Sequence, residues 1–132
     1  MTRVVVPVRY PLSAHSRQTL ETAIDLARDH DAELTVLHVN LYQNDGRVTR
    51  RELRRAVEQS FGSLDNARYV VRSGFLVEET ILDEIVGEDA DYVVIGRKQA
   101  SRWRRMVRSL VDDPDVESFL REKLDAQVVT AG

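Results

Sequence analysis

The sequence predicts an α/β fold, a three-layer α/β/α sandwich built on a parallel sheet. Three observations lead to this prediction. Five apolar runs of strand length recur along the 132-residue chain. The segments between them carry apolar residues every three or four positions, which is typical of amphipathic helices. The run 91–96 is largely apolar and ends in glycine, as an inner parallel strand covered on both faces does. Strands that alternate with helices imply right-handed crossovers, so helices should cover both faces of the sheet.

The predicted strands are 3–9, 33–39, 67–72, 91–96 and 127–130. Pro7 lies inside the first of them, although proline lacks the backbone N–H that a central strand needs. We therefore expect Pro7 to lie near the end of its strand, where the hydrogen-bond ladder runs out.

Four helices are predicted between the strands. The first begins near Ser13 or Ser16, because either hydroxyl can act as the N-cap. Asp113 followed by Pro114 predicts the start of the fourth, since these residue types suit the N-cap and the first helical position. The apolar stripes are Leu20, Ala23, Ile24 and Ala27 in the first helix, Leu53, Val57 and Phe61 in the second, Val77, Ile81 and Ile85 in the third, and Val116, Phe119, Leu120 and Leu124 in the fourth.

Composition limits the classes of protein and site that are possible. A length of 132 residues with 42% apolar content predicts a single domain, 1–132. The absence of cysteine excludes disulfides, thiolate metal sites and a cysteine nucleophile. The histidines His15, His30 and His38 lack the paired spacing of a zinc site. No apolar signal region precedes the first strand and no run has transmembrane length, so we expect a cytoplasmic protein with no membrane span.

Four segments, taken in order, resemble the universal stress protein (UspA) family. They are Val4-Val5-Val6-Pro7-Val8, the strand region 32–39, the segment 74–85 and the run 90–96. The resemblance covers essentially the whole chain. It implies a five-stranded parallel sheet of order 3-2-1-4-5, an adenine nucleotide hydrolase-like (Rossmann-like) arrangement. It also implies a protein that is usually dimeric and often binds ATP at the carboxyl ends of the strands.

The ATP-binding motif of that family is degenerate here. ATP-binding members carry an Asp after the first strand, then Gly-x-x-Gly, nine residues and Gly-Ser or Gly-Thr after the fourth. Glycines let backbone N–H groups approach phosphate oxygens. In this chain the Asp position is Arg9, the second glycine is Gln99, and the last pair is Ser109-Leu110, so only Gly96 is kept. With a longer gap, carboxylates at Asp113 and Asp115 would repel the phosphates. The nucleotide-binding positions by resemblance are Pro7, Arg9, Val39, Ile95, Gly96, Arg97, Gln99 and Ser109.

A basic segment, 97–110, stands in place of the glycine loop. Its apolar residues recur at helical spacing between arginines, which predicts a basic amphipathic turn or short helix. One interpretation is a docking element for an anionic partner. The other, which we favour, is that Trp103 and Met106 pack over the vacated crevice while the arginines pair with Asp112, Asp113 and Asp115. A second basic cluster, at 47–55, is interpreted as a solvated helix face with Glu58 as a partner of Arg54 or Arg55.

The predicted function is a non-catalytic stress-response module that acts through dimerisation and contacts with an unknown protein, with ATP binding weak or lost. We expect no enzymatic activity, because no catalytic constellation is visible and His38 is interpreted as a core residue. No cofactor is expected. The alternative is a nucleotide-binding protein that holds ATP phosphates with Arg97, Lys98 or Arg9. A net charge of −3 makes a nucleic-acid partner unlikely. The predicted homodimer interface is the last strand, Gln127, Val128, Val129 and Thr130, which would be an unpaired sheet edge.

Overall fold

The structure is a computed structural model that describes residues 1–44, 46–110 and 126–131. Its strands are β1 (Arg3–Pro7), β2 (Glu33–Leu41), β3 (Ala67–Gly74), β4 (Tyr92–Gly96) and β5 (Gln127–Ala131). Its helices are α1 (Ala14–Asp29), α2 (Arg50–Phe61), α3 (Val77–Glu88) and α4 (Arg97–Leu110). No helix among the described residues is long and apolar enough to cross a membrane.

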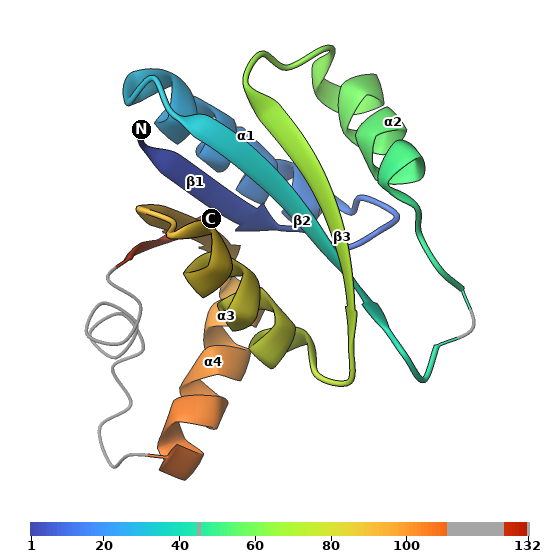
Figure 1. Cartoon of the computed structure of the whole chain (residues 1–132), viewed down its shortest axis with the longest axis vertical. Helices are drawn as coiled ribbons and strands as arrows, with labels where there is room; N and C mark the ends of the chain where they lie inside the picture. Colours follow the sequence, from blue (N-terminus) through green and yellow to red (C-terminus); the bar gives the residue numbers. More distant parts are fainter. Residues whose placement is uncertain (45, 111–125, 132) are drawn as a thin grey trace.

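All strand pairs are parallel, and the sheet order is β3-β2-β1-β4-β5. Helices lie on both faces of this twisted sheet (Figure 1). Side chains of α1 and α2 share one apolar cluster with one face, and side chains of α3 and α4 share a second cluster with the other. The predicted three-layer α/β/α sandwich and its strand order are therefore confirmed.

Several element boundaries differ from the prediction for local reasons. β1 ends at Pro7 rather than at residue 9, as expected of a proline at a strand end, although the N–H of Val8 still donates to the carbonyl of Leu37 at 2.8 Å. Ser13, not Ser16, caps α1, since its hydroxyl accepts from the N–H of Ser16. The helix predicted from Asp113, with its stripe of Val116, Phe119, Leu120 and Leu124, lies outside the described residues. The basic segment does form a helix, α4.

The second cluster contains the largest fully buried side chain, Trp103, whose exposed fraction is 0%. It lies in one cluster with the sheet residues Val5 and Ile95 and with Ile81 and Ile85 of α3. Burial of an indole removes a large apolar area from water, so Trp103 fixes α4 to the sheet. The prediction that this tryptophan packs inward is confirmed.

A polar network crosses the same layer at the amino ends of β2 and β3. The hydroxyl of Thr35 donates to Oε1 of Glu88 at 2.7 Å, and Nη2 of Arg68 lies 3.0 Å from that oxygen. Within the described residues, Oε2 of Glu88 has no hydrogen-bond partner. Burial raises the pKa of the Glu88 carboxyl, while Thr35 and Arg68 oppose the shift in part. One turn away, Glu84 pairs with Arg72 at 3.0 Å.

We expect Glu88→Gln to change the pH dependence of stability. Because the folded-state pKa of Glu88 is raised, its favourable contribution is present at low pH and is lost as pH rises through that pKa. The melting temperature of the variant minus that of the unmodified protein should therefore become more positive as the pH rises from about 4 to neutral. Glu79→Gln, a change at an exposed carboxyl, is the control. A difference for Glu88→Gln that does not vary with pH would contradict the prediction.

Replacing Trp103 with Ala should destabilise the protein by about 3–5 kcal/mol, the range for removing a buried large aromatic side chain. Chemical denaturation measures this, and Val86→Ala, at a 58% exposed position, is a matched control that should cost less than about 0.5 kcal/mol. Trp103 is the only tryptophan, so its fluorescence reports on this position alone. Native emission at the wavelength of a fully hydrated indole, or rapid iodide quenching, would show that the residue is not buried.

Candidate functional site

The predicted nucleotide-binding residues gather at one end of the sheet. β1, β2 and β4 are adjacent and parallel, so Pro7, Val39 and Gly96 lie together at the carboxyl ends of their strands. Arg9 follows β1 and is exposed, as is Arg97 at the start of α4. Ile95, in contrast, is buried to 1% exposure, within the cluster that contains Trp103. Ser109 belongs to α4, and its side chain lies outside the described part of the structure. The fold thus brings the predicted positions together, but Ile95 is already covered by protein.

β4 passes directly into α4, with no loop between Gly96 and Arg97. A Cβ at Gly96 would lie 3.2 Å from Oγ1 of Thr19, so this glycine allows the end of β4 to approach α1 closely. The one glycine kept from the ATP motif therefore has a packing role. The second motif position, Gln99, lies inside the first turn of the helix, where a flexible phosphate loop would otherwise be.

Two buried polar atoms in α4 lack hydrogen-bond partners among the described residues. They are Nε2 of Gln99 and Nε1 of Trp103. An unsatisfied buried N–H costs free energy, on the order of 1–3 kcal/mol. The apolar contacts of Trp103 outweigh that cost, which again indicates that α4 is held mainly by packing.

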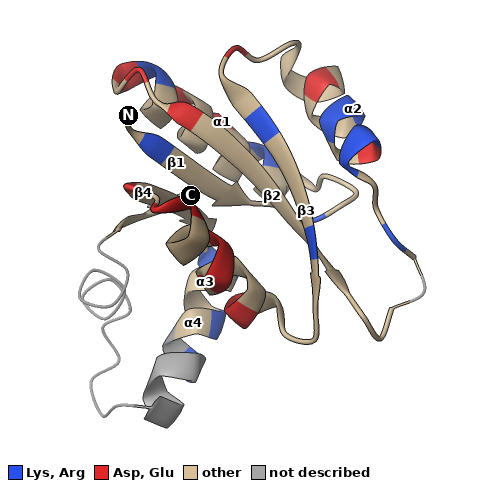
Figure 2. Cartoon of the chain, viewed as in Figure 1, with Lys and Arg blue, Asp and Glu red and all other residues tan. Residues whose placement is uncertain are grey.

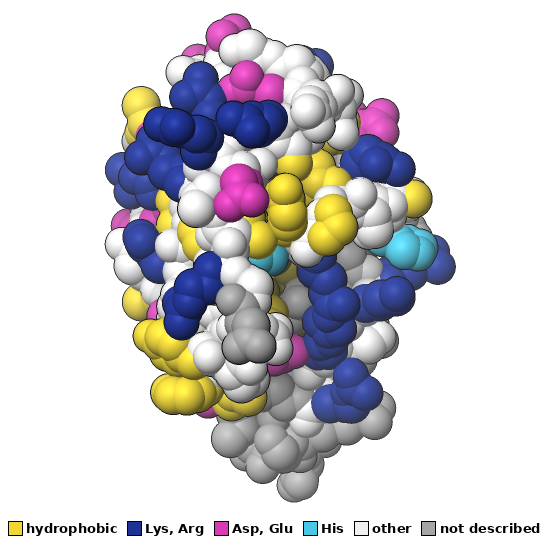
Figure 3. Space-filling model, turned by 90° about the vertical axis from the view of Figure 1, so that its right-hand side faces the viewer, with side chains coloured by type: hydrophobic (Ala, Val, Ile, Leu, Met, Phe, Trp, Pro, Cys, Tyr) yellow, Lys and Arg dark blue, Asp and Glu magenta, His cyan; other side chains and the backbone are white. Residues whose placement is uncertain are grey.

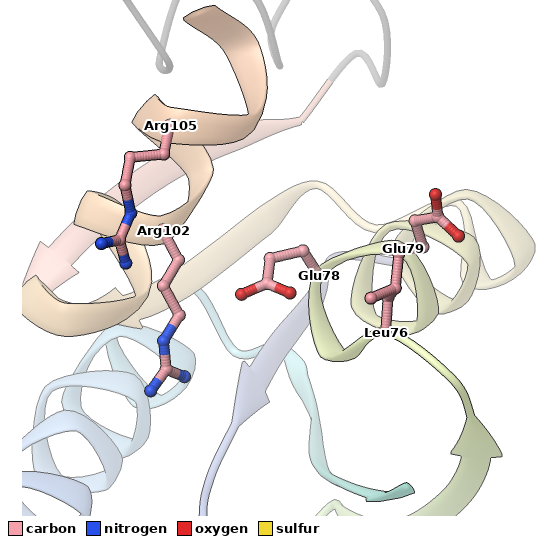
Figure 4. Close-up of a pocket in the computed structure, with 5 residues that line it drawn as sticks. All are labelled: Leu76, Glu78, Glu79, Arg102 and Arg105. Atoms are coloured by element: carbon pink, nitrogen blue, oxygen red, sulfur yellow. The ribbon is translucent and has the colours of Figure 1, made fainter. Parts of the chain in front are cut away.

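A hollow of about 400 Å³ lies between α3 and α4. It is lined by Leu76, Glu78, Glu79, Arg102 and Arg105. Arg102 and Arg105 project from α4, while Glu78 and Glu79 come from the first turn of α3, and Glu78 points across the hollow (Figure 4). The wall therefore carries two cations and two carboxylates, that is, charges of both signs.

None of the residues predicted from the resemblance lines this hollow. The sequence did point to Arg102 and Arg105, as part of the basic segment. It did not point to Glu78 and Glu79, because acidic residues in a helix first turn are ordinary partners of the helix dipole. Only the packing of α3 beside α4 makes these four charges neighbours.

Residues of both signs lie at both ends of the strands (Figure 2), since Arg28 and Arg68 are exposed at the amino ends and Glu79 at the carboxyl ends. Exposed carboxylates precede β2, β3 and β4 at the amino ends of the strands, at Asp29, Asp31, Asp65, Asp89 and Asp91. Exposed cations follow β1, β2 and β4 at the carboxyl ends, at Arg9, Arg47, Arg50, Arg51, Arg97 and Lys98. On the side toward which β1 points, basic side chains gather on both sides of a hollowed surface, with hydrophobic side chains between them (Figure 3). Although the net charge of the chain is −3, this face is therefore rich in basic side chains.

The histidines and metal-binding side chains show no catalytic arrangement in the described residues. Nδ1 of His38 lies 3.1 Å from the carbonyl of Val8, so its ring bonds to the backbone, but the side chain is half-buried and belongs to neither apolar cluster, unlike the core residue that the sequence predicts. His30 packs against Tyr92, with ring centroids 4.8 Å apart. The described part of the chain holds no group of three or more His, Cys, Asp or Glu residues placed to bind a metal ion.

Solved structures similar to this one share its fold. A universal stress protein UspA from Lactobacillus plantarum aligns with a TM-score of 0.64 and 18% identity, over 99% of this chain and 97% of the other. An Archaeoglobus fulgidus universal stress protein in complex with dAMP aligns with a TM-score of 0.58 and 18% identity, over 100% and 98%. A universal stress protein in complex with cAMP aligns with a TM-score of 0.59 and 13% identity, over 97% and 96%. No curated protein matches the chain in sequence.

The sequence itself matches the model of the universal stress protein family over residues 1–113, which is most of the 132-residue chain. The matched region contains β1 to β4 and α1 to α4, the elements that form the carboxyl-end crevice. The resemblance seen in the sequence segments is thus confirmed by an independent comparison, and the chain belongs to the universal stress protein family.

Proposed function

We propose that the chain is a non-catalytic regulatory member of the universal stress protein family. It acts in the cytoplasm through dimerisation and protein contacts, and ATP binding of the family kind is weak or lost. The observation that carries the proposal is the direct junction between β4 and α4, together with the complete burial of Trp103. After the first turn, the backbone N–H groups of such a helix are engaged in helix bonds. Only the first-turn N–H groups remain for phosphate oxygens, and the packing of Trp103 fixes their direction.

The charges at the crevice support the same conclusion. Arg9 stands where ATP-binding relatives have a carboxylate, and Gln99 places a side chain where they have a glycine. Among the described residues, the ring hydrogen bond of His38 goes to a carbonyl and not to a nucleophile, which supports a role without catalysis.

The alternative is a nucleotide site built from cations. Arg9, Arg97 and Lys98 are exposed at the carboxyl end of the sheet, and arginine binds phosphate through paired hydrogen bonds. Two similar structures are complexes with dAMP and with cAMP, ligands that carry a single phosphate. A monophosphate needs fewer backbone donors than ATP does, so this alternative favours a nucleoside monophosphate.

We expect calorimetric titration with ATP and magnesium to give no saturable binding, with a dissociation constant well above about 1 μM. The same titration with AMP tests the alternative. Protein purified without added nucleotide should release none when denatured, as judged by chromatography. If the dissociation constant is micromolar, and both Arg97→Ala and Lys98→Ala raise it, the proposal is wrong and the alternative is correct.

The dimer proposal concerns the edge strand β5. β5 is terminal in the sheet order, so one side of its backbone is free to pair within the described structure. Val128 is 6% exposed and belongs to the core of its own subunit, which leaves it little surface to offer. Val129 is half-buried, while Gln127 and Thr130 are exposed. A two-fold pairing of β5 strands would therefore use Gln127, Val129 and Thr130 more than Val128.

Val129→Lys should shift the protein from dimer to monomer, because a charge on an edge strand opposes pairing with a second strand. Light scattering at tens of micromolar measures the change, and circular dichroism checks that the sheet is retained. Val71→Lys is a matched control, since Val71 is also a half-buried valine that packs against the same cluster but lies on β3 at the opposite edge. A monomeric unmodified protein, or a dimer that Val129→Lys leaves intact, would place the interface elsewhere.

A further inference from the structure

An exposed apolar patch lies at the carboxyl ends of β2 and β3. It consists of Tyr42, Phe75 and Leu76, whose exposed fractions are 48%, 72% and 54%. Large apolar side chains on a monomer surface are ordinary when they are scattered, but a contiguous group marks a contact site. The rings of Tyr42 and Phe75 are 4.7 Å apart, so these two side chains form one surface, and the exposed Leu76 follows Phe75 directly in the chain.

Hydrogen bonds hold this patch in its exposed position. The N–H of Tyr42 donates to the carbonyl of Gly74 at 3.0 Å, and Nε2 of Gln43 donates to the carbonyl of Phe75 at 3.1 Å. Oγ1 of Thr80 donates to the carbonyl of Leu76 at 2.8 Å. The turn is also tight, because a Cβ at Gly74 would lie 2.1 Å from that hydroxyl oxygen. The patch is therefore presented by a fixed turn, which lowers the entropy cost of binding.

Cations flank the patch on the side of α2. Asn40 exchanges two hydrogen bonds with Val48, of 2.9 and 3.0 Å, which returns the chain after β2 to the end of that strand. This places Arg47 beside β3, with its Nη1 3.5 Å from Oγ of Ser73. Arg50 and Arg51 follow, exposed in the first turn of α2. Cations at a helix N-terminus oppose the helix dipole, so their position costs stability and calls for a role outside the fold.

A second pair of cations lies on the other side of Leu76. Leu76 also lines the hollow between α3 and α4, whose far wall carries Arg102 and Arg105. The near wall carries Glu78 and Glu79, so this side presents both signs of charge. The patch thus lies between a flank that holds Arg47 and a wall of mixed charge.

We propose that the Tyr42–Phe75–Leu76 patch, with Arg47 near it and Arg50 and Arg51 following in the first turn of α2, is the docking site for an acidic protein segment that carries bulky apolar side chains. This inference rests on the proposed function, because it names the class of partner for a protein that acts through protein contacts. Aromatic and arginine side chains together are typical of the residues that dominate binding at protein interfaces. A net charge of −3 opposes a long phosphate backbone more than a short acidic segment.

The test is a titration of the full chain with a short fluorescent peptide in which Glu alternates with Leu and Trp. The peptide should bind with a dissociation constant no weaker than about 100 μM. Phe75→Ser should weaken binding at least about tenfold, and Arg47→Ala with Arg51→Ala should weaken it and reduce its dependence on salt. Val86→Ser and Arg28→Ala are matched controls, since they remove an exposed apolar side chain and an exposed cation elsewhere and should leave binding unchanged.

Three comparison probes decide the class of partner. A polyglutamate of equal length tests charge alone, the same peptide with Lys for Glu tests apolar contact alone, and a single-stranded oligonucleotide tests a nucleic acid. Each should bind at least about tenfold more weakly than the acidic apolar peptide. Equal or tighter binding of any of them overturns the proposal, and so does no binding of the acidic peptide at millimolar concentration. Light scattering and ATP titration of the same samples separate failure of the docking site from failure of the proposed function.

Discussion

The burial of Trp103 is the constraint on which the carboxyl end of this structure depends. With a rise of about 1.5 Å per residue, the indole lies roughly 9 Å along the helix from Arg97, so α4 must begin directly at the end of β4 for Trp103 to reach the core. The residues that relatives use as a phosphate loop are thereby taken up by the first turns of a helix. Gly96 is still needed, because Thr19 of α1 lies where a Cβ would be. The burial of Trp103 and the replacement of the phosphate loop by a helix therefore have one cause.

Electrostatics at the start of α2 and α4 works against the fold, whereas Glu78 and Glu79 at the start of α3 are favourably placed. α1 has no acidic residue in its first turn, and Arg50 and Arg97 open α2 and α4 although the dipole favours anions there. The Thr49–Glu52 capping box offsets part of this cost in α2. Stability must then come mainly from the two apolar clusters on either side of the sheet. A surface that is costly to the fold and still strongly basic is better explained by a partner than by packing.

Much of the fold follows from the sequence, because apolar periodicity reports burial directly. The stripes at Ile81 and Ile85 and the run before Gly96 place α3 and β4 correctly, and proline chemistry explains why β1 ends at Pro7. The Thr35–Glu88 hydrogen bond joins residues 53 positions apart, so no local pattern could indicate it. Phe75 and Leu76 are placed wrongly by hydrophobicity. Their side chains suggest core positions, but the turn at Gly74 exposes them. The hydrophobicity of a side chain predicts burial, but the backbone geometry of the turn determines whether that side chain can reach the core.

The same distinction applies to the site. Sequence comparison identifies positions where relatives contact a nucleotide, and the fold does bring Pro7, Val39 and Gly96 together. A shared position does not give shared chemistry. The first turn of α4 still has free N–H groups, but Gln99 and Arg9 stand where the family motif has a glycine and a carboxylate. The surface that indicates a binding partner lies instead at the rigid apolar turn of Phe75 and Leu76, with Arg47 from another part of the chain near it. Such a surface suits an extended polypeptide, which can place an apolar side chain on Phe75 and a carboxylate near Arg47 along one strand length.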